Sequence, residues 1–328
     1  MTIVITQENA NKMIRDYLKK TLGFSSGLIK KLKAREDGIT VNGSHVTVRY
    51  VLNEGDTLVL ADEDRIEDTS PYIIPIDLPL KIAFEDSDLT VADKPSAMPA
   101  HPSYSHRDDT VANALVFRYQ GSPYVFRPVN RLDGDTSGLM LTANNHIAAI
   151  KLYSAMINGT IGKMYIALLT NEPPEEYGII DLHMKRCNES IITRRVADPT
   201  EEGARRAVTV YKKIFTDKET GICAVVASPV TGRTHQLRVH FTALGCPLVG
   251  DSLYGTADER IGRHALHAAY LSFPHPKDSE TIHVYSPLPS DMRAVLGETL
   301  SIEAEKALKE ESLGKLKTMY DEMKKDIK

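Results

Sequence analysis

Hydrophobic and polar positions first outline a small unit at the start of the chain. In residues 11–23 and 25–37 the apolar side chains recur at helical spacing, which predicts two helices. Either Ser25 or Ser26 can cap the second of them. Residues 39–48 (ITVNGSHVTV) carry β-branched runs on both sides of an Asn-Gly dipeptide, which is typical of a hairpin turn. This unit is therefore predicted to hold two helices and a small antiparallel sheet.

The longer remainder of the chain is predicted to consist of strands with few long helices. The predicted strands cover residues 89–95, 163–170, 207–215 and 221–228. Residues 233–245 (RTHQLRVHFTALG) have an apolar face at helical spacing and predict a helix with Thr234 as its N-cap. Because strands and helices do not alternate regularly, the pattern favours an α+β fold over a repeated βαβ unit.

Charge and proline content suggest where the parts of the chain meet. An acidic and then proline-rich stretch separates the two units and has the composition of a linker. The expected parts are an N-terminal domain at residues 1–62, a linker at 63–74, a large domain at 75–295 and a charged C-terminal tail at 296–328. The tail has an apolar stripe formed by Leu316, Met319, Met323 and Ile327. This stripe predicts a helix that either packs on the body or lies in solvent.

Composition narrows the class of protein. The 328 residues carry a net charge of −4, so contact with nucleic acid would have to come from local basic patches. Three widely spaced cysteines form no disulfide framework or zinc motif, which suggests a reducing compartment. We find no signal peptide, no membrane-spanning apolar run and no glycine-rich nucleotide loop. We therefore expect a cytoplasmic monomer that needs no nucleotide cofactor and no metal.

The loop at residues 129–138 (VNRLDGDTSG) contains the most distinctive polar cluster. Asp133 and Asp135 with the following serine and glycine resemble the start of a calcium-binding loop. Such a loop needs a glutamate at its twelfth position, which here is Asn144. Two interpretations remain open at this point. The loop is either a turn whose side chains bond their own backbone or a bend that holds a catalytic carboxylate.

Several ordered segments resemble one enzyme family. RLDGDTSG is similar to the signature HRLD-x-x-TSG of the RluA-type RNA pseudouridine synthases. Further segments that resemble this family are IAFEDSDLTVADKPSAMPAHPS (82–103), KMYIAL (163–168), PVTGRTHQLRVHFTALGCPLVGDSLYG (229–255) and LHAAYLSFPHP (266–276). The resemblance spans roughly residues 75–290. It implies the pseudouridine synthase fold, with a mixed and largely antiparallel central sheet. The N-terminal unit resembles an S4-type RNA-binding domain.

The resemblance implies three catalytic residues. Asp133 corresponds to the family's nucleophile, and the reaction it starts needs no redox cofactor. Because burial would favour the neutral carboxyl group, a nearby cation is expected to keep Asp133 charged. Arg238 corresponds to that cation, with Arg233 as the competitor for the role. Tyr165 corresponds to the tyrosine that stacks on the extruded uracil and takes part in proton transfer at carbon 5.

Other positions are assigned to RNA binding or to structure. Asn130 stands where the family usually has histidine, so it can position the loop but cannot transfer a proton. We expect RNA or base contacts from Asn130, Arg131, Thr136, Arg233, Lys30, Lys31, Lys33 and Arg35. Thr136, Ser137 and Gly138 are also expected to shape the turn. For the motif histidines we expect structural hydrogen bonding, and they are His235, His240 and His267.

The sequence therefore predicts an RNA pseudouridine synthase that acts on ribosomal RNA or, second, on transfer RNA. One alternative is a catalytically silent RNA-binding or ribosome-assembly factor with the same fold. Another is a carboxylate-dependent hydrolase, which would need a partner carboxylate at a defined separation from Asp133.

Overall fold

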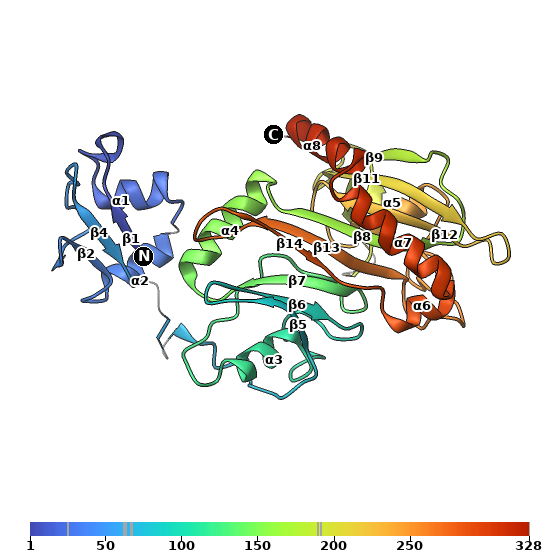
Figure 1. Ribbon diagram of the computed structural model, residues 1–328, viewed down its shortest axis with the longest axis horizontal. Coiled ribbons are helices and arrows are strands. Elements are labelled where there is room, and N and C mark those ends of the chain that lie inside the picture. Colours follow the sequence, from blue (N-terminus) through green and yellow to red (C-terminus); the bar gives the residue numbers. More distant parts are fainter. Residues whose placement is uncertain (25, 62–63, 66–67, 189, 191, 328) are drawn as a thin grey trace.

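The computed structural model describes residues 1–24, 26–61, 64–65, 68–188, 190 and 192–327. It contains two separate sheets, a small one formed by the N-terminal residues and a large one formed by the rest (Figure 1). The expected boundary at residues 62 and 63 and the proposed cap Ser25 lie outside the described residues. None of the helices in the described part combines the length and apolar character that crossing a membrane requires.

The small sheet has the strand order β1-β4-β2-β3 and is antiparallel throughout. Its elements are β1 (Thr2–Val4), a 3-10 turn (Gln7–Asn9), α1 (Ile14–Asp16), a π-helical turn (Tyr17–Thr21), α2 (Ser26–Lys33), β2 (Ile39–Val41), β3 (Ser44–His45) and β4 (Thr57–Leu60). The Asn42-Gly43 dipeptide joins β2 to β3, as the sequence predicts. The two helical segments bury their apolar sides against this sheet, so the predicted pattern is confirmed.

The large sheet runs in the order β10-β9-β11-β12-β8-β13-β7-β6-β5, and β14 also pairs with β13. Its strands are β5 (Lys81–Glu85), β6 (Leu89–Lys94), β7 (Ser137–Ala143), β8 (Gly162–Leu169), β9 (Tyr177–Arg186), β10 (Arg194–Ala197), β11 (Arg205–Thr216), β12 (Cys223–Pro229), β13 (Leu266–Pro274) and β14 (Thr281–Tyr285). Neighbouring strands are antiparallel except for β13 and β7, which are parallel and pair only through His267–Ser137 and Ala268–Gly138. The prediction of an α+β fold with a mixed, largely antiparallel sheet is confirmed.

Helices cover both faces of the large sheet. They are α3 (Val111–Arg118), α4 (His146–Asn158), α5 (Gln236–Ala243), α6 (Ser290–Leu296), α7 (Glu298–Glu311) and α8 (Lys315–Ile327). Along β8, Met164 and Ile166 belong to the core that includes residues of α6, α7 and α8. Tyr165 and Ala167 belong to the core that includes residues of α5. Both faces of β8 are therefore buried, and α5 covers the face that carries Tyr165.

The N-terminal unit is attached to the large sheet through α4, which lies between them in Figure 1. Ile147 of α4 belongs to the apolar core of the N-terminal unit, and Ile150 packs against that core. Beside this contact Arg127 donates a hydrogen bond of 2.8 Å to Asp64, whose side chain is 3% exposed. The attachment thus combines apolar packing with a buried ion pair.

The start of α5 differs from the sequence prediction, whereas the C-terminal tail forms helices as expected. Thr234 was predicted to cap α5, but this is wrong, because the cap residue is His235 in a left-handed conformation with φ of 57°. The side chain of Gln236, the first residue of α5, accepts a hydrogen bond from the Arg233 backbone N–H. This bond gives a partner to a backbone donor of the turn that precedes the helix. The C-terminal tail forms α7 and α8, and Leu316 packs in the body's core. The Ile327 side chain lies outside the described residues.

Candidate active site

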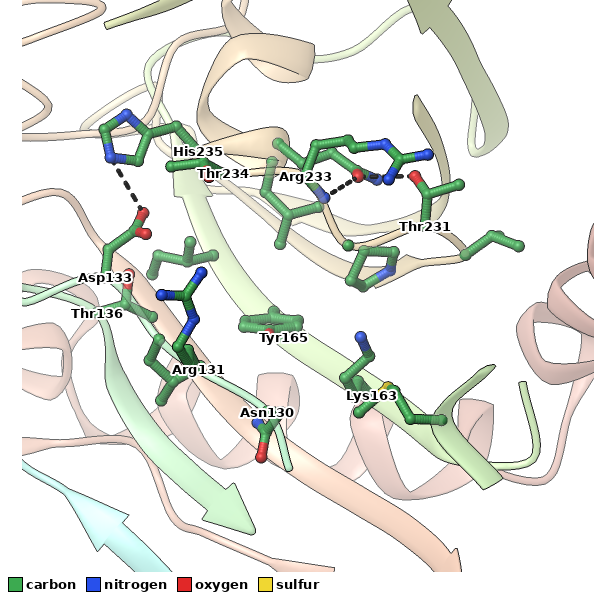
Figure 2. Close-up of a pocket in the computed structure, with 18 of the residues that line it drawn as sticks. Asn130, Arg131, Asp133, Thr136, Lys163, Tyr165, Thr231, Arg233, Thr234 and His235 are labelled. Atoms are coloured by element: carbon green, nitrogen blue, oxygen red, sulfur yellow. Dashed lines mark hydrogen bonds and ion pairs between the residues drawn. The ribbon is translucent and has the colours of Figure 1, made fainter. Parts of the chain in front are cut away.

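A cleft of about 710 Å³ opens where the loop before β7 faces β8 and the start of α5 (Figure 2). Asp133 contributes its only carboxylate among the described lining residues. The lysines and arginines that line it are Arg131, Lys163, Arg233, Arg238 and Lys324. The cleft is therefore locally cationic in a chain whose net charge is negative.

The backbone of the loop fixes the position of Asp133. The Thr136 N–H donates to the Asp133 carbonyl at 3.1 Å and closes a tight turn. The buried Lys94 ammonium donates to the Gly134 carbonyl and, at 2.8 Å, to the Met98 carbonyl. Burial lowers the pKa of Lys94 to about 7, although Asp135 and Asp133 act against this shift. The Asp133 side chain is left 28% exposed and faces the cleft.

Gly138 sets the direction in which this loop enters the sheet. Its φ is +109°, a conformation that favours glycine. A Cβ atom at this position would overlap the carbonyl oxygen of Ala268 on β13. This conformation agrees with the expectation that Gly138 helps to shape the turn. The close approach of β7 to β13 follows from the absence of a side chain.

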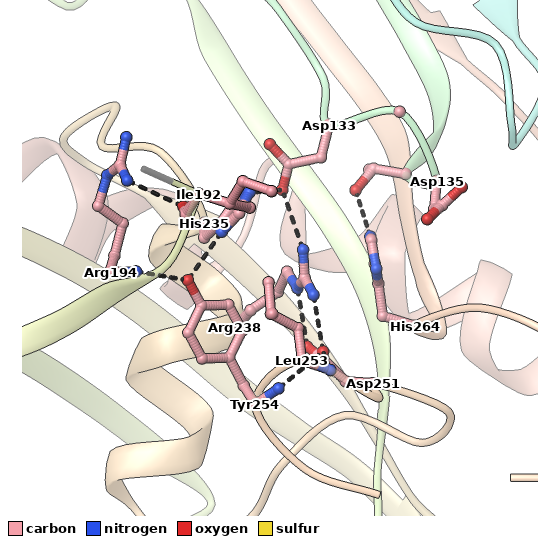
Figure 3. Close-up of polar contacts among 12 residues, drawn as sticks. Asp133, Asp135, Ile192, Arg194, His235, Arg238, Asp251, Leu253, Tyr254 and His264 are labelled. Carbon is pink, nitrogen blue, oxygen red and sulfur yellow. Dashed lines mark hydrogen bonds and ion pairs between the residues drawn. The ribbon is translucent and has the colours of Figure 1, made fainter. Parts of the chain in front are cut away.

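Arg238 lies between two carboxylates (Figure 3). Its Nη1 atom is 3.9 Å from Asp133, whereas Nε and Nη2 donate two hydrogen bonds of 2.8 and 2.7 Å to Asp251. Burial disfavours its charge, but the contacts with Asp251 and then Asp133 raise the pKa of Arg238. Burial would also raise the pKa of Asp251, and Arg238 holds it below its ordinary value. The structure confirms the expected Arg238–Asp133 contact and makes Asp251 the stronger partner.

His235 approaches the same carboxylate oxygen of Asp133, Oδ2, as Arg238 does. Its Nε2 atom is 3.8 Å from Asp133, and its Nδ1 atom is hydrogen-bonded to the Tyr254 hydroxyl at 2.8 Å. The Tyr254 hydroxyl also accepts a hydrogen bond from the backbone N–H of Arg194 (Figure 3). Burial lowers the pKa of His235, which favours the neutral ring despite the nearby carboxylate. His235 is thus both the left-handed residue at the start of α5 and the residue whose ring lies close to Asp133.

Sequence reasoning assigned no role to Asp251 or Tyr254 and only a structural one to His235. Asp251 and Tyr254 occur in the segment GDSLYG, which resembles the family's GD-x-x-YG, so that match could have pointed to them. Their contacts with Arg238 and His235 appear only when the chain folds, because they come from a loop after α5.

Tyr165 is buried on β8 and lines the cleft next to Lys163. Burial, and then the charge of Asp133, raise the pKa of Tyr165, so its hydroxyl stays protonated at neutral pH. Its ring lies in the cleft between Asp133 and Lys163 in the view of Figure 2. This arrangement offers an apolar surface beside the carboxylate.

The residues expected to contact RNA have different surroundings. Asn130 is buried, donates to the Leu139 carbonyl and accepts from the Leu141 N–H, so its amide joins the loop to β7. Thr136 is buried, and its hydroxyl is hydrogen-bonded to His264 at 2.8 Å. In contrast, Arg131 and Arg233 are exposed and line the cleft. Thr136 and Asn130 also line the cleft, but their polar atoms already have partners.

The basic cluster of the N-terminal unit does not line the cleft. Lys30 and Lys33 are exposed on α2. Lys31 forms an ion pair with Asp68 at 2.6 Å, and Arg35 forms one with Asp37 at 2.9 Å. Two charges of this cluster therefore have acidic partners, and the ammonium groups of Lys30 and Lys33 are exposed to solvent.

The motif histidines differ in their bonding. His267 is hydrogen-bonded to the Ser137 hydroxyl at 2.9 Å and to the Ser286 carbonyl, so the expectation for it is confirmed. The expectation is wrong for His240, because neither ring nitrogen has a hydrogen-bond partner among the described residues. Burial lowers the pKa of His240 to about 4, which keeps the buried ring neutral.

One cluster in the described residues brings three potential metal ligands together, namely Asp86, Asp88 and His275. Asp86 accepts hydrogen bonds from the Asp88 and Leu89 N–H groups and is 2.9 Å from His275. These contacts are those of an ordinary turn. The cluster does not line the cleft.

Comparisons with known proteins agree with this architecture. A family profile described as RNA pseudouridylate synthase matches residues 88–243. The chain is 37% identical over 277 residues to "Uncharacterized RNA pseudouridine synthase YjbO" of Bacillus subtilis, which covers 84% of this chain and 95% of that protein. It is 34% identical over 234 residues to "Ribosomal large subunit pseudouridine synthase D" of Zymomonas mobilis, which covers 67% of this chain and 72% of that protein.

A solved structure is also similar. "Human RNA Pseudouridylate Synthase Domain Containing 1" superposes with a TM-score of 0.54 at 27% identity and covers 70% of this chain and 95% of that one. The matches to three Bacillus subtilis proteins, at 31 to 37% identity, cover 95 to 96% of those proteins and 84 to 90% of this chain. The chain therefore belongs to the RNA pseudouridine synthase family and is an isomerase that acts on RNA.

Proposed function

We propose that this enzyme isomerises uridines of ribosomal RNA, or else of transfer RNA, with Asp133 as the nucleophile. The observation that carries the proposal is the place of Asp133. It is the one carboxylate among the described residues that line the cationic cleft, and it lies 3.9 Å from Arg238, which a second carboxylate already holds. The ion pair keeps Asp133 near a cation without a short hydrogen bond to it. The carboxylate is then free to attack.

The neighbouring residues supply the rest of the chemistry. The uracil must leave ribose through N1, turn and rejoin through carbon 5, after which the carbon 5 proton is lost and N1 gains one. Tyr165 offers its ring to the extruded base, and its protonated hydroxyl acts as a relay in the proton transfer at carbon 5. The reaction is redox-neutral, so the proposal includes no nucleotide cofactor and no metal.

RNA binding is assigned to two regions. In the cleft, Arg131 and Arg233 grip the RNA backbone or fill the place of the flipped base, while Asn130 and Thr136 hold the loop that faces it. The residues at 1–62 act as an S4-like RNA-binding domain through Lys30, Lys31, Lys33 and Arg35. A linker at 63–74, a catalytic domain at 75–295 and a helical tail at 296–328 complete the chain.

The ribosomal assignment is supported by relatives that are named ribosomal large subunit pseudouridine synthase D. The cationic side chains of the cleft can bind the phosphates of a folded RNA, and its small apolar surface can hold a flipped base. We also propose that the enzyme works as a monomer in the cytoplasm, where such RNA is found.

The test uses unmodified ribosomal and transfer RNA labelled with tritium at carbon 5 of uridine. Asp133→Ala is compared with wild type and with Asp135→Ala, which removes an exposed carboxylate two residues away. We expect wild type and Asp135→Ala to release tritium to water, and Asp133→Ala to release none above background.

Other outcomes would contradict the proposal. Binding of RNA without tritium release by wild type would support a silent RNA-binding factor. Free uracil in the products would instead indicate a hydrolase. Equal release by wild type and Asp133→Ala would remove Asp133 from the nucleophile's role.

A further inference from the structure

Two donors from the start of α5 face one oxygen of the Asp133 carboxylate. The Nε2 atom of His235 lies 3.8 Å from Oδ2, and the Nη1 atom of Arg238 lies 3.9 Å from the same oxygen. Both distances are longer than a hydrogen bond, so each donor lies beside the oxygen without binding it tightly. Arg238 acts through its fixed charge. What His235 offers to Asp133 depends on which ring nitrogen carries the proton and on whether the ring is charged.

A short chain of hydrogen bonds decides where the proton of the His235 ring lies (Figure 3). The backbone N–H of Arg194, the first residue of β10, donates to the Tyr254 hydroxyl oxygen at 2.8 Å. The same hydroxyl is 2.8 Å from Nδ1 of His235, which is the one acceptor for the hydroxyl proton among the described residues. Tyr254 therefore donates to Nδ1. In a neutral ring the proton must then lie on Nε2, the nitrogen that faces Asp133.

Tyr254 also supports the second donor. The Arg238 guanidinium lies over the Tyr254 ring, 4.9 Å from its centroid, which is a cation–π contact. The His235 ring meets the Tyr254 ring edge to face, with centroids 5.6 Å apart. Asp251 holds Arg238 through two hydrogen bonds and accepts a further one from the Tyr254 backbone N–H. Residues 251–254 thus fix both groups that face Asp133.

The surroundings of His235 favour a neutral ring. Burial lowers the pKa of His235, and the opposing effect of Asp133 does not reverse the shift. The hydrogen bond from Tyr254 adds to this preference, because a bond donated to Nδ1 favours the form without a proton there. Besides Tyr254, the charged and titratable groups that act on the ring are Asp133, Arg238, Arg194, Asp251 and His264.

We propose that His235 is a positioning residue for the reaction: its Nε2–H, directed by Tyr254, steadies Oδ2 of Asp133 together with Arg238 and leaves Oδ1 to face the substrate RNA. This inference rests on the proposed function, in which Asp133 is the nucleophile. It goes beyond the structural hydrogen bonding that the sequence led us to expect. It also gives a reason for the φ of 57° at His235, because this uncommon conformation turns the ring toward Asp133.

The first test compares two amides at position 235. In His235→Gln the amide N–H reaches the place of Nε2, whereas the shorter side chain of His235→Asn reaches only toward Tyr254. Asparagine tolerates a left-handed conformation better, so a purely structural residue would be replaced better by asparagine. We expect the opposite order of activity.

His235→Asn should lower the rate of tritium release at saturating RNA by roughly ten- to a hundredfold, because misplacing a reacting group by about 1 Å has an effect of this order. His235→Gln should lower it by a few-fold only. RNA affinity should change little in either variant, since the ring acts on Asp133. Thermal unfolding of each variant reports whether the start of α5 stays folded.

The second test uses Tyr254→Phe, which keeps the ring beneath Arg238 and removes the hydroxyl. Without the hydrogen bond to Nδ1 the pKa of His235 rises, so the ring becomes charged at a higher pH. The acid limb of the rate at saturating RNA should therefore move to higher pH. Tyr270→Phe is the matched control, because the Tyr270 hydroxyl is also 2.8 Å from a histidine, His283, and neither residue lines the cleft. Its pH profile should match that of wild type.

A third measurement identifies the tautomer without RNA. Nitrogen NMR of protein with isotope-labelled histidine distinguishes a proton on Nε2 from one on Nδ1, and the signals missing from His235→Gln are those of His235. At neutral pH we expect a neutral His235 ring with its proton on Nε2.

The two proposals fail in different ways. If wild type releases no tritium, or Asp133→Ala releases as much as wild type, the proposed function fails, while NMR still reports the tautomer. If Asp133 is essential but the His235 proton lies on Nδ1, the positioning role is wrong. It is also wrong if His235→Asn is as active as His235→Gln, or if Tyr254→Phe keeps the acid limb of wild type. Losses of rate that follow losses of melting temperature in every variant would make His235 a structural residue only.

Discussion

At the scale of single residues, the arrangement around Asp133 depends on how Arg238 is shared. Asp251 takes two short hydrogen bonds from Arg238, and Asp133 is left with a 3.9 Å contact. A carboxylate that accepted both bonds itself would be held as a strong ion pair and would be a weaker nucleophile. In the proposed mechanism Asp251 is a positioning residue, because it keeps the Arg238 cation near Asp133 without a short hydrogen bond between them.

Asp251→Asn is expected to reduce the rate at saturating RNA by roughly a hundredfold, because Arg238 then turns toward Asp133. It should also lower the free energy of unfolding by about 3 kcal/mol, the scale for breaking a buried ion pair. Tritium release and urea unfolding measure the two effects. Asp258→Asn, which removes the partner of the half-exposed Arg260, is the control and should change neither.

The difference in free energy of unfolding between wild type and Asp251→Asn should also depend on pH. The pKa of Asp251 is lower in the folded protein than its ordinary value, so its contribution to stability is complete above the unfolded pKa and is lost as the pH falls through the folded one. The gap between wild type and Asp251→Asn should therefore close below about pH 4. A gap that is constant down to pH 3 would contradict this account.

At the scale of elements, the active loop is positioned by the one parallel pairing in the described sheet. β7 and β13 pair only at their first residues, and Gly138 lies at that contact. The loop leaves the pair at this point. Its own Asn130 side chain bonds the backbone of β7, and Lys94 donates to the Gly134 carbonyl of the loop. The position of Asp133 thus depends on a strand contact that tolerates no side chain.

Gly138→Ala is expected to destabilise the protein by about 3 kcal/mol or more, because it combines an unfavourable φ with overlap of the β13 backbone. We also expect activity to fall further than the loss of folded protein explains. Gly134→Ala in the same loop is the control, since a Cβ there meets no atom within 4 Å. Chemical unfolding and tritium release per folded molecule provide the measurements, and equal behaviour of the two variants would contradict the argument.

At the scale of the whole molecule, the N-terminal unit and the large sheet are joined by a small contact. Ile147 contributes to the core of one unit from a helix of the other, and Asp64 pairs with Arg127 beside it. Domains joined in this way move relative to each other when such a contact is weakened. The contact sets how the basic helix α2 is presented relative to the cleft.

Arg127→Met is expected to leave Asp64 buried beside only His146 and to weaken this contact by about 3 kcal/mol. Limited proteolysis should then cut several-fold faster between the two units, and affinity for long structured RNA should fall. Isomerisation of a short RNA should continue, because such an RNA contacts only the cleft and does not reach the N-terminal unit. Arg118→Met, which breaks an exposed ion pair with Glu85, serves as the control and should leave the proteolysis rate unchanged.

The sequence by itself determined the class of the fold and, through the resemblance to one family, the candidate residues of the cleft. Short apolar runs predicted β6, β8, β11 and β12, because a strand with two buried faces needs a continuous apolar run. The segment RLDGDTSG, together with the ordered segments around it, led to Asp133, Tyr165 and Arg238 before any contact was known. Local patterns suffice for the strands because they are properties of neighbouring residues, whereas the candidate site residues came from the resemblance to the family.

Only the tertiary structure decided which partners these residues have. Asp251, Tyr254 and His235 gather around Arg238 and Asp133 through a loop and a left-handed residue that periodicity does not predict. Lys324 reaches the cleft because α8 packs across β11, more than 150 residues after Lys163. The physical reason is the same in each case. Charges separated along the chain interact according to their distance in space, and the packing of the sheet and its helices sets that distance.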